Sequence, residues 1–376
     1  MNALAQALKN PWRQMIAVDA AAMIGLFLYK VLYNNPELEY LHPIIDYHFG
    51  FAKRAFIGTL VSFVLPVVPV WFVYVLGGAI WLLALVLFLK LFSKTFGFDT
   101  ATAPLFAFIF GSPFFLKNFV QTVGYFDIYG CVVALVMLLI PARSFGYVVI
   151  GTLCCAVLIL IQPIHMLLYV PAVATIVVMR HYFTRSPTVA DVIGGVVLAL
   201  AVAAVFIASA FYGAMPVSMD RLISYLRQRT SDDAYLAPIF IDIWYRPISN
   251  DMARTWNVLP DHARRFPVYA LLIALHWPVI HYFKRLVQAL GSAWHRRLTV
   301  AALVAVTLGY VIIGAVVFDY SRWVSNWAVC MFLIMHAVKM LPARNAVPLI
   351  AADDKWALRL GWAVTAIPRV GTTKPF

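Results

Sequence analysis

The sequence predicts an all-α protein, a polytopic transmembrane helical bundle of about ten spans, and three observations support this fold class. Of the 376 residues, 63% are hydrophobic and only 12% are Asp, Glu, Lys or Arg, about half the charged share of a soluble domain. Apolar runs near the ~20 residues that a helix needs to cross a bilayer recur along the chain. Aromatic residues reach 15%, which is typical of proteins with interfacial Trp and Tyr belts. This composition excludes a soluble enzyme, a disordered tail and a nucleic-acid-binding module.

The first span begins close to the N-terminus. Lys9 and Arg13 precede an apolar run from Met15 to Leu32, and no small-residue cleavage site follows, which indicates an uncleaved span rather than a signal peptide. By length and hydrophobicity we predict spans at 15–33, 70–92, 101–116, 127–142, 145–161, 164–180, 188–212, 266–283, 298–318 and 323–341.

One further apolar stretch, 55–69, is interrupted by Pro66 and Pro69. We interpret it as a tilted or re-entrant helix, which is tolerated where protein shelters its backbone.

Ten spans place both termini in the cytoplasm, and the charges support this orientation. On this layout 17 of the 29 basic residues lie in inner segments, as the positive-inside rule requires. Residues 1–341 then form a single transmembrane domain whose longest polar stretch is a periplasmic loop, 213–265. Residues 342–376 form a cytoplasmic tail. Within it, the stretch from Asp353 to Val364 is predicted to be an interfacial helix that Asp353 or Asp354 caps.

Four polar residues mark the first outer loop. Asp46 and His48 precede a helix-like stretch, and Lys53 and Arg54 follow about two turns later. A carboxylate beside an imidazole suits general base chemistry. An adjacent lysine and arginine suit a phosphate, through a point charge and a bidentate fork. The alternative is an interfacial helix with salt-bridged edges.

Four more candidates lie at other outer ends. Asp127 begins the fourth span, where a carboxylate also favours the helix dipole, so capping is the alternative to substrate binding. His165 follows a Gln-Pro break, and the alternative is a hydrogen-bonded structural residue. Asp319 and Arg322 are three residues apart and can face each other on one helical turn, so a mutual salt bridge is the alternative to an active-site role.

All eight candidates reach one membrane face on this layout. Ionisable groups are costly to retain in apolar surroundings, so we place the function at this face. The signals for a metal are weak: the pair Asp232-Asp233 is too short a pattern. The four cysteines lie in apolar stretches without CxxC spacing, so we expect neither a disulfide framework nor a zinc site.

These clusters resemble segments of bacterial polytopic membrane proteins of polysaccharide assembly, the O-antigen-polymerase-like proteins and the C-type glycosyltransferases. The segments that carry the resemblance are Gly50-Phe-Ala-Lys53-Arg54-Ala-Phe-Ile-Gly58, Gly124-Tyr-Phe-Asp127, the His165 segment and Asp319-Tyr-Ser-Arg322-Trp. They are short, and the chain lacks the large extracytoplasmic domain of many C-type enzymes.

The resemblance implies a glycosyltransferase or polysaccharide polymerase of the bacterial inner membrane. It would transfer a sugar or oligosaccharide from a polyprenyl-phosphate or diphosphate carrier at the periplasmic face. The catalytic residues would be Asp46, His48 and Asp319, with Asp46 as the base. Substrate and phosphate would be bound by Lys53, Arg54, Asp127, His165 and Arg322.

The expected partners are membrane lipids, a lipid-linked saccharide and other proteins of cell-envelope biosynthesis, with no nucleic acid. The polyprenyl-phosphate carrier is part of the substrate, no separate cofactor is predicted, and the need for a divalent metal stays open. The alternative functions are a transporter or flippase for a lipid-linked or anionic substrate, and a non-catalytic scaffold subunit.

Overall fold

The computed structural model describes residues 10–185, 187–246 and 248–370, and this part of the chain is helical with no β-strand, which confirms the all-α prediction. The helices of the first half are α2 (Pro11–Tyr33), α3 (Glu37–Ile44), α4 (Phe56–Ser62), α5 (Phe72–Thr95), α6 (Ala103–Phe110), α7 (Leu116–Gln121), α8 (Asp127–Leu139), α9 (Gly146–Ile161), α10 (His165–Leu168) and α11 (Val170–Val177), the last continued by the π-helical turn η1 (Val178–Tyr182).

The second half adds nine α-helices to the described part. They are α12 (Val189–Tyr212), α13 (Met219–Leu226), α14 (Pro238–Ile241), α15 (Ile248–Ala263), α16 (Phe266–Leu275), α17 (Trp277–Gln288), α18 (Ala293–Val316), α19 (Tyr320–Lys339) and α20 (Lys355–Thr365). Two 3-10 turns, η2 (Asp233–Tyr235) and η3 (Asp242–Trp244), lie between α13 and α15.

Four of the described helices, α2, α5, α12 and α18, are long and apolar enough to cross a membrane. A fifth span results if α16 and α17, which are bent by 67°, count as one broken helix. Helices α8 and α9 are apolar but shorter. These helices indicate a membrane protein, whereas the ten spans and the orientation of the termini stay predictions.

Several predicted spans are divided because prolines interrupt apolar runs. In the run 101–116, α6 ends at Phe110, before Pro113, and α7 begins only at Leu116. The run 266–283 bends at His276, just before Pro278. Proline has no backbone N–H and clashes with the preceding turn, so a helix seldom continues through it unbent. Apolar composition therefore predicts burial in lipid or protein here, but not one continuous helix.

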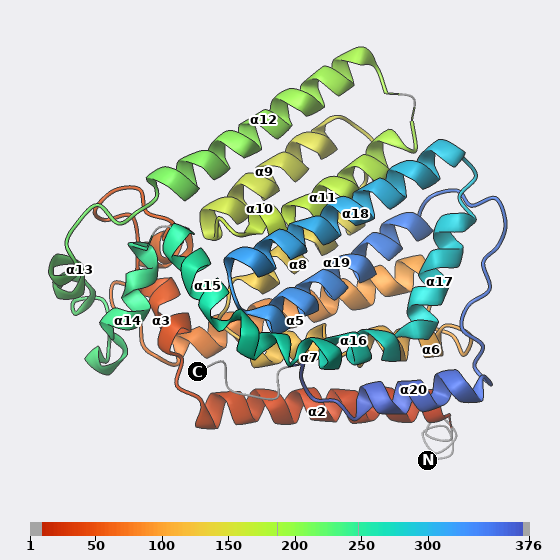
Figure 1. Cartoon of the computed structure of the whole chain (residues 1–376), viewed down its shortest axis with the longest axis horizontal. Coiled ribbons are helices and arrows are strands. Elements are labelled where there is room, and N and C mark those ends of the chain that lie inside the picture. The colour runs from red at the N-terminus through yellow and green to blue at the C-terminus, as the bar shows by residue number, and fades with distance from the viewer. Residues whose placement is uncertain (1–9, 186, 247, 371–376) are drawn as a thin grey trace.

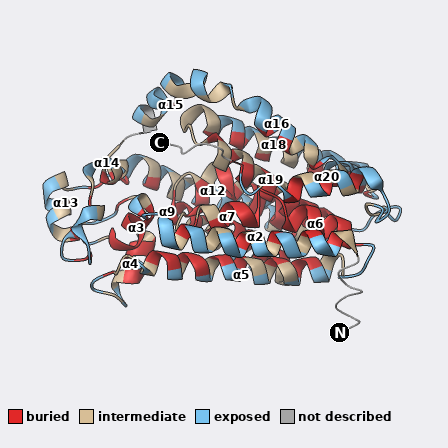
Figure 2. Cartoon of the chain, turned by 90° about the horizontal axis from the view of Figure 1, so that it is seen from below, coloured by how far each residue is buried: buried red, intermediate tan, exposed pale blue. Residues whose placement is uncertain are grey.

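The main helices lie side by side in a roughly parallel array (Figure 1). Their inner faces form one large core, while α2, α12 and α18 carry many exposed apolar residues. Figure 2 shows the exposed face of α2. That pattern is expected of helices whose outer faces contact lipid.

A second core closes one end of the array, and we call this part the end cap. It is built from α3, α4, α13 and α14. Tyr40, Leu41 and Trp244 are completely buried in it. Val68, in the proline-rich stretch after α4, forms an isolated parallel bridge with Thr230. Much of the predicted outer loop 213–265 is therefore packed structure.

The C-terminal tail contains the predicted helix. Helix α20 begins after Asp354, whose Oδ1 accepts hydrogen bonds from the backbone N–H groups of Trp356 (2.8 Å) and Ala357 (3.1 Å). Instead of lying alone, α20 packs against α2, α6 and α16. The segment that follows it runs on as far as a cavity at the capped end, where Val370 forms part of the wall.

Candidate functional site: a basic cavity beside the end cap

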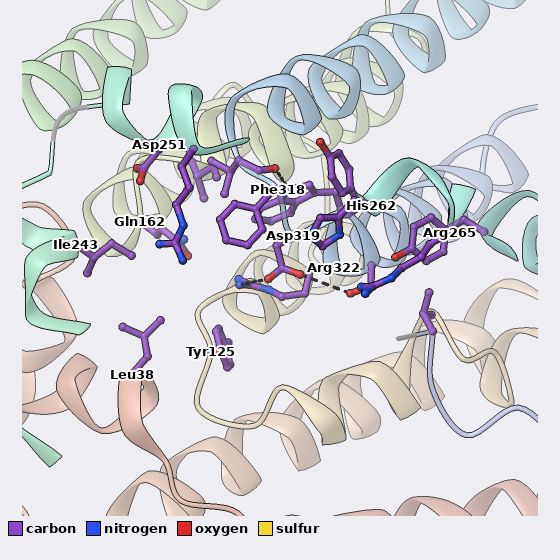
Figure 3. A pocket seen from close by; sticks show the side chains of 18 of the residues that line it. Leu38, Tyr125, Gln162, Ile243, Asp251, His262, Arg265, Phe318, Asp319 and Arg322 are labelled. Atoms are coloured by element: carbon purple, nitrogen blue, oxygen red, sulfur yellow. Dashed lines mark hydrogen bonds and ion pairs between the residues drawn. The ribbon is translucent and has the colours of Figure 1, made fainter. Parts of the chain in front are cut away.

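A cavity of about 210 Å³ lies where α15, α16 and the first turn of α19 meet the loops before α4 and α8. We call it the basic cavity because five of its lining residues are arginines: Arg54, Arg246, Arg254, Arg265 and Arg322. Two carboxylates, those of Asp251 and Asp319, also line it. Figure 3 shows Asp251, Arg265, Asp319 and Arg322 among the side chains that line this space.

Arg322 is the most firmly held of these arginines. Its Nε and Nη2 each donate to a different carboxylate oxygen of Asp127 at 2.9 Å, and its Nη1 donates to Asp319 Oδ2 at 2.8 Å. The guanidinium carbon also lies 4.5 Å from the centre of the Tyr125 ring and 5.1 Å from that of Trp323. Two carboxylates and two aromatic rings therefore fix the plane of this group.

A buried network supports Asp127 from behind. Asn326 Nδ2 donates to Asp127 Oδ2 at 3.0 Å, and Tyr169 donates its hydroxyl to Asn326 Oδ1 at 2.7 Å. Asp127 is 1% exposed and begins α8, so its carboxylate is buried in the first turn of that helix. The fully buried His165 lies close enough for the charge of Asp127 to act on its ring, but it does not line the basic cavity.

Arg54, Arg254 and Arg265 differ from Arg322, because among the described residues no carboxylate oxygen lies within 4.0 Å of their nitrogens. Arg254 lies over the Phe318 ring, 5.0 Å from its centre.

Arg54 takes a rare backbone conformation, with φ at 64°. A non-glycine residue in this region is strained by roughly 1 kcal/mol. Burial, together with the positive charge of Arg322, lowers the pKa of Arg54 to about 10. The side chain nevertheless stays charged at neutral pH, as a partly buried cation facing the cavity.

His42 forms another part of the cavity wall. Its ring stacks on Phe126 with centres 3.9 Å apart, and Nδ1 lies 3.2 Å from the Gly124 carbonyl oxygen. Burial, reinforced by the charge of Arg54, lowers the pKa of His42 to about 3. The imidazole is therefore neutral at physiological pH.

Asp46, His48 and Lys53 are not among the residues that line the basic cavity. Asp46 instead joins the first loop to the end cap: it accepts a hydrogen bond from the Tyr225 hydroxyl at 2.7 Å and lies 3.4 Å from Arg229 Nη1. The His48 ring stacks on Tyr225 at 4.2 Å.

Lys53 has two backbone contacts in this region. Its Nζ donates to the Arg246 carbonyl oxygen at 2.5 Å, and its backbone N–H donates to the Gly213 carbonyl oxygen at 2.7 Å. Burial lowers the pKa of Lys53 to about 8. These contacts connect the end cap to Arg246, two residues before α15, and to Gly213, just after α12. Lys53 itself does not line the cavity.

Four lining residues of the 251–265 stretch were not among the sequence candidates, because this stretch was interpreted as a loop. They are Asp251, Arg254, His262 and Arg265. A signal was present: these four are spaced at intervals of three and eight residues, which places them on one face of a helix.

No family model, curated protein or solved structure matches this chain. The family suggested by the short motifs therefore stays an expectation, and the chemistry of the site has to be argued from its own residues.

The electrostatics of the basic cavity favour an anion. In the described part of the chain, four carboxylates pair with only two of the five guanidinium groups: Asp127 and Asp319 with Arg322, and Asp242 and Asp251 with Arg246. Burial lowers the pKa of both histidines in the wall, His42 and His262. Arginine binds phosphate oxygens through paired N–H donors, and it does so most strongly where water is scarce. The described residues contain no group of three His, Cys, Asp or Glu side chains that could hold a metal ion.

Proposed function

We propose that this chain is a membrane-embedded transferase that binds the phosphate or diphosphate of a lipid-linked sugar in the basic cavity and transfers the sugar to an acceptor. The observation that carries the proposal is the set of three cavity arginines without a carboxylate partner, Arg54, Arg254 and Arg265. Arg54 and Arg265 are partly buried, whereas Arg254 is exposed. Partly buried cations are costly without a counter-ion. A bound phosphate supplies one.

The reaction breaks the bond between the sugar's anomeric carbon and the phosphate oxygen, and it forms a bond from that carbon to an acceptor hydroxyl oxygen. Negative charge grows on the departing phosphate, where fixed guanidinium groups stabilise it most effectively. Arg322 is positioned for this role because Asp127 and the flanking rings hold it rigidly.

The acceptor proton needs a base. Asp319 lines the cavity and its side chain is 24% exposed, whereas the buried Asp46 contacts Tyr225 and Arg229 outside the cavity. We therefore favour Asp319 over Asp46 as the base. We further propose that the protein lies in the bacterial inner membrane and that the cavity opens to the periplasm.

A transporter or flippase is the second candidate function, and one observation favours it. Helices α16 and α17 form a bent pair with a break of one residue at His276. Broken helices are common at the substrate sites of transporters.

An assay in detergent solution separates the two functions. Purified protein, given a polyprenyl-diphosphate-linked sugar and candidate acceptors, should form a glycosylated product even without a sealed membrane. Asp319→Asn and Arg265→Gln should lower the rate, and Arg264→Gln should not, because Arg264 is exposed and does not line the cavity. Sugar-lipid movement in sealed vesicles without any product in detergent would contradict the transferase.

A further inference from the structure

A second cavity, of about 610 Å³, lies between α16, α17, α18 and α19. Its wall is mostly aliphatic and aromatic, and the polar residues that line it are His276, Lys284, Gln288 and Thr307. On α18 the residues that line it are half exposed: Val300, Val304 and Leu308 are 50%, 52% and 54% exposed. We call this feature the apolar groove, and it opens toward the surroundings of the bundle.

The groove exists because α16 and α17 diverge. The His276 side chain fixes the bend between them: Nδ1 lies 2.8 Å from the Leu272 carbonyl oxygen and Nε2 lies 2.9 Å from Ser112 Oγ. Beyond the 67° bend, α17 turns out of the direction of α16 (Figure 1).

The apolar groove and the basic cavity share two walls. Helix α16 contributes Tyr269 to the basic cavity and Ile273, about one turn later, to the groove. Helix α19 contributes Arg322 and Trp323 to the basic cavity and Trp327 to the groove. The same pair of helices therefore lines first a cationic section and then an apolar one.

The basic cavity and the apolar groove together are long enough to hold the headgroup and part of the chain of a lipid. From Arg322 to Phe332, the last groove residue on α19, ten helical residues rise about 15 Å. That is about half of the ~30 Å hydrocarbon core of a bilayer. A chain that starts at the cationic end thus has room to run about as deep as one leaflet.

We propose that the apolar groove holds the hydrocarbon chain of a long-chain lipid phosphate whose phosphate group lies in the basic cavity. This inference rests on the proposed function and names the site of the carrier's chain. Charge complementarity selects the occupant: a lipid with a neutral or zwitterionic headgroup leaves the unpaired arginines without a counter-ion, whereas a phosphate or diphosphate supplies one. The chain then anchors the headgroup next to Arg322.

Photolabelling tests this directly. The probe is a polyprenyl phosphate with a photoreactive diazirine on the chain near the phosphate, and the purified full chain is reconstituted in nanodiscs of neutral phospholipid. Labelled peptides from α16, α18 and α19 are compared with those from α12, whose Val197 and Leu200 are exposed but line neither feature. The same diazirine on a polyprenol without phosphate is the control probe.

We expect the phosphate probe to label the groove helices at least about tenfold more than α12, and the polyprenol to label both alike. Arg54→Gln combined with Arg265→Gln should bring the ratio for the phosphate probe close to one. Val304→Trp fills the groove from an exposed position. It should also bring the labelling ratio for the phosphate probe close to one, while leaving pyrophosphate binding intact. Val197→Trp should change nothing.

Equal labelling of the groove helices and α12 by the phosphate probe would overturn the proposal. So would an unchanged ratio in Val304→Trp. Because labelling requires no sugar transfer, a chain that labels as expected but forms no glycosylated product contradicts the transferase alone. A chain that is active but labels uniformly contradicts only the groove.

Discussion

The ammonium group of Lys117 lies 2.6 Å from Asp19 Oδ1, and both side chains are completely buried. Lys117 Nζ also donates to the backbone carbonyl oxygens of Thr365 (3.0 Å) and Ile367 (3.3 Å), and the Thr365 hydroxyl donates to Asp19 Oδ2 at 3.1 Å. One ion pair thus ties α2 to α7 and to the C-terminal segment, whose Val370 reaches the basic cavity.

Removing one partner of this ion pair should strongly destabilise the folded protein. We expect Lys117→Met to lower the free energy of unfolding by about 3–5 kcal/mol, because it leaves an uncompensated carboxylate in the core. Asp19→Asn combined with Lys117→Met should recover much of that loss, since no charge then remains buried. Thermal unfolding of the purified protein in detergent measures both.

The matched control for Lys117 is an exposed ion pair. Arg227 and Asp233 lie 3.4 Å apart with side chains 63% and 61% exposed, so Arg227→Met should change the stability by no more than about 1 kcal/mol. If Lys117→Met were as mild as Arg227→Met, the buried pair would not hold the tail.

The support behind Asp127 gives a second prediction. Asn326→Leu removes a donor to Asp127 and leaves the Tyr169 hydroxyl without its acceptor. A buried polar group that loses its partner costs about 1–3 kcal/mol, so Asn326→Leu should destabilise the protein by that amount.

A double-mutant cycle with Tyr169→Phe tests whether the network acts as one unit. Coupled residues in one hydrogen-bond network show interaction energies of about 0.5–3 kcal/mol. We therefore expect the double variant to lose less stability than the sum of the two single losses, as measured by denaturant unfolding. Strict additivity would mean that Tyr169 and Asn326 do not support Asp127 together.

The helical class, the cap of α20 and the Asp319–Arg322 pair follow from local patterns, namely apolar runs, an acid before a helix and a three-residue spacing. Such features depend on neighbours in sequence. Asp127, Asp319 and Arg322 lie together at one end of the bundle, and which membrane face this end occupies stays a prediction.

Other features depend on contacts between distant segments, which a single sequence does not reveal. The buried pair of Lys117 and Asp19 is an example, because 98 residues separate the two in the sequence. Asp46 was paired with His48 as a catalytic unit from their spacing. The structure instead brings Tyr225 and Arg229 to Asp46 through the packing of α13, and its catalytic role stays a prediction.

The lowered pKa of His42 predicts an acid-sensitive stability. In the unfolded chain His42 titrates near its ordinary pKa of about 6.5, and in the folded chain near about 3. Between these values the unfolded state binds more protons, so stability falls as pH drops through this window. Between pH 7 and pH 5 this one group should cost about 2 kcal/mol.

His42→Gln isolates this contribution, because glutamine does not titrate. The loss of thermal stability between pH 7 and pH 5 should be smaller in His42→Gln than in the unsubstituted chain. The stacking on Phe126 is lost at both pH values and so cancels in the comparison. Identical pH dependence in the two proteins would show that His42 is accessible to protons in the folded state.

Anion binding by the basic cavity can be measured without any sugar donor. Isothermal titration of the purified protein with pyrophosphate should show a single site, and Arg265→Gln should weaken it by roughly 10- to 100-fold, since a hydrogen bond to a charged group contributes about 1.5–3 kcal/mol. Arg264→Gln, the adjacent exposed arginine outside the cavity, should leave the affinity within about twofold. Raising the salt concentration from about 0.1 M to about 1 M shortens the screening length from about 10 Å to about 3 Å. This should weaken pyrophosphate binding by both variants. Equal losses in Arg265→Gln and Arg264→Gln would show that pyrophosphate is attracted by the surface charge of the 246–265 stretch and not bound inside the cavity.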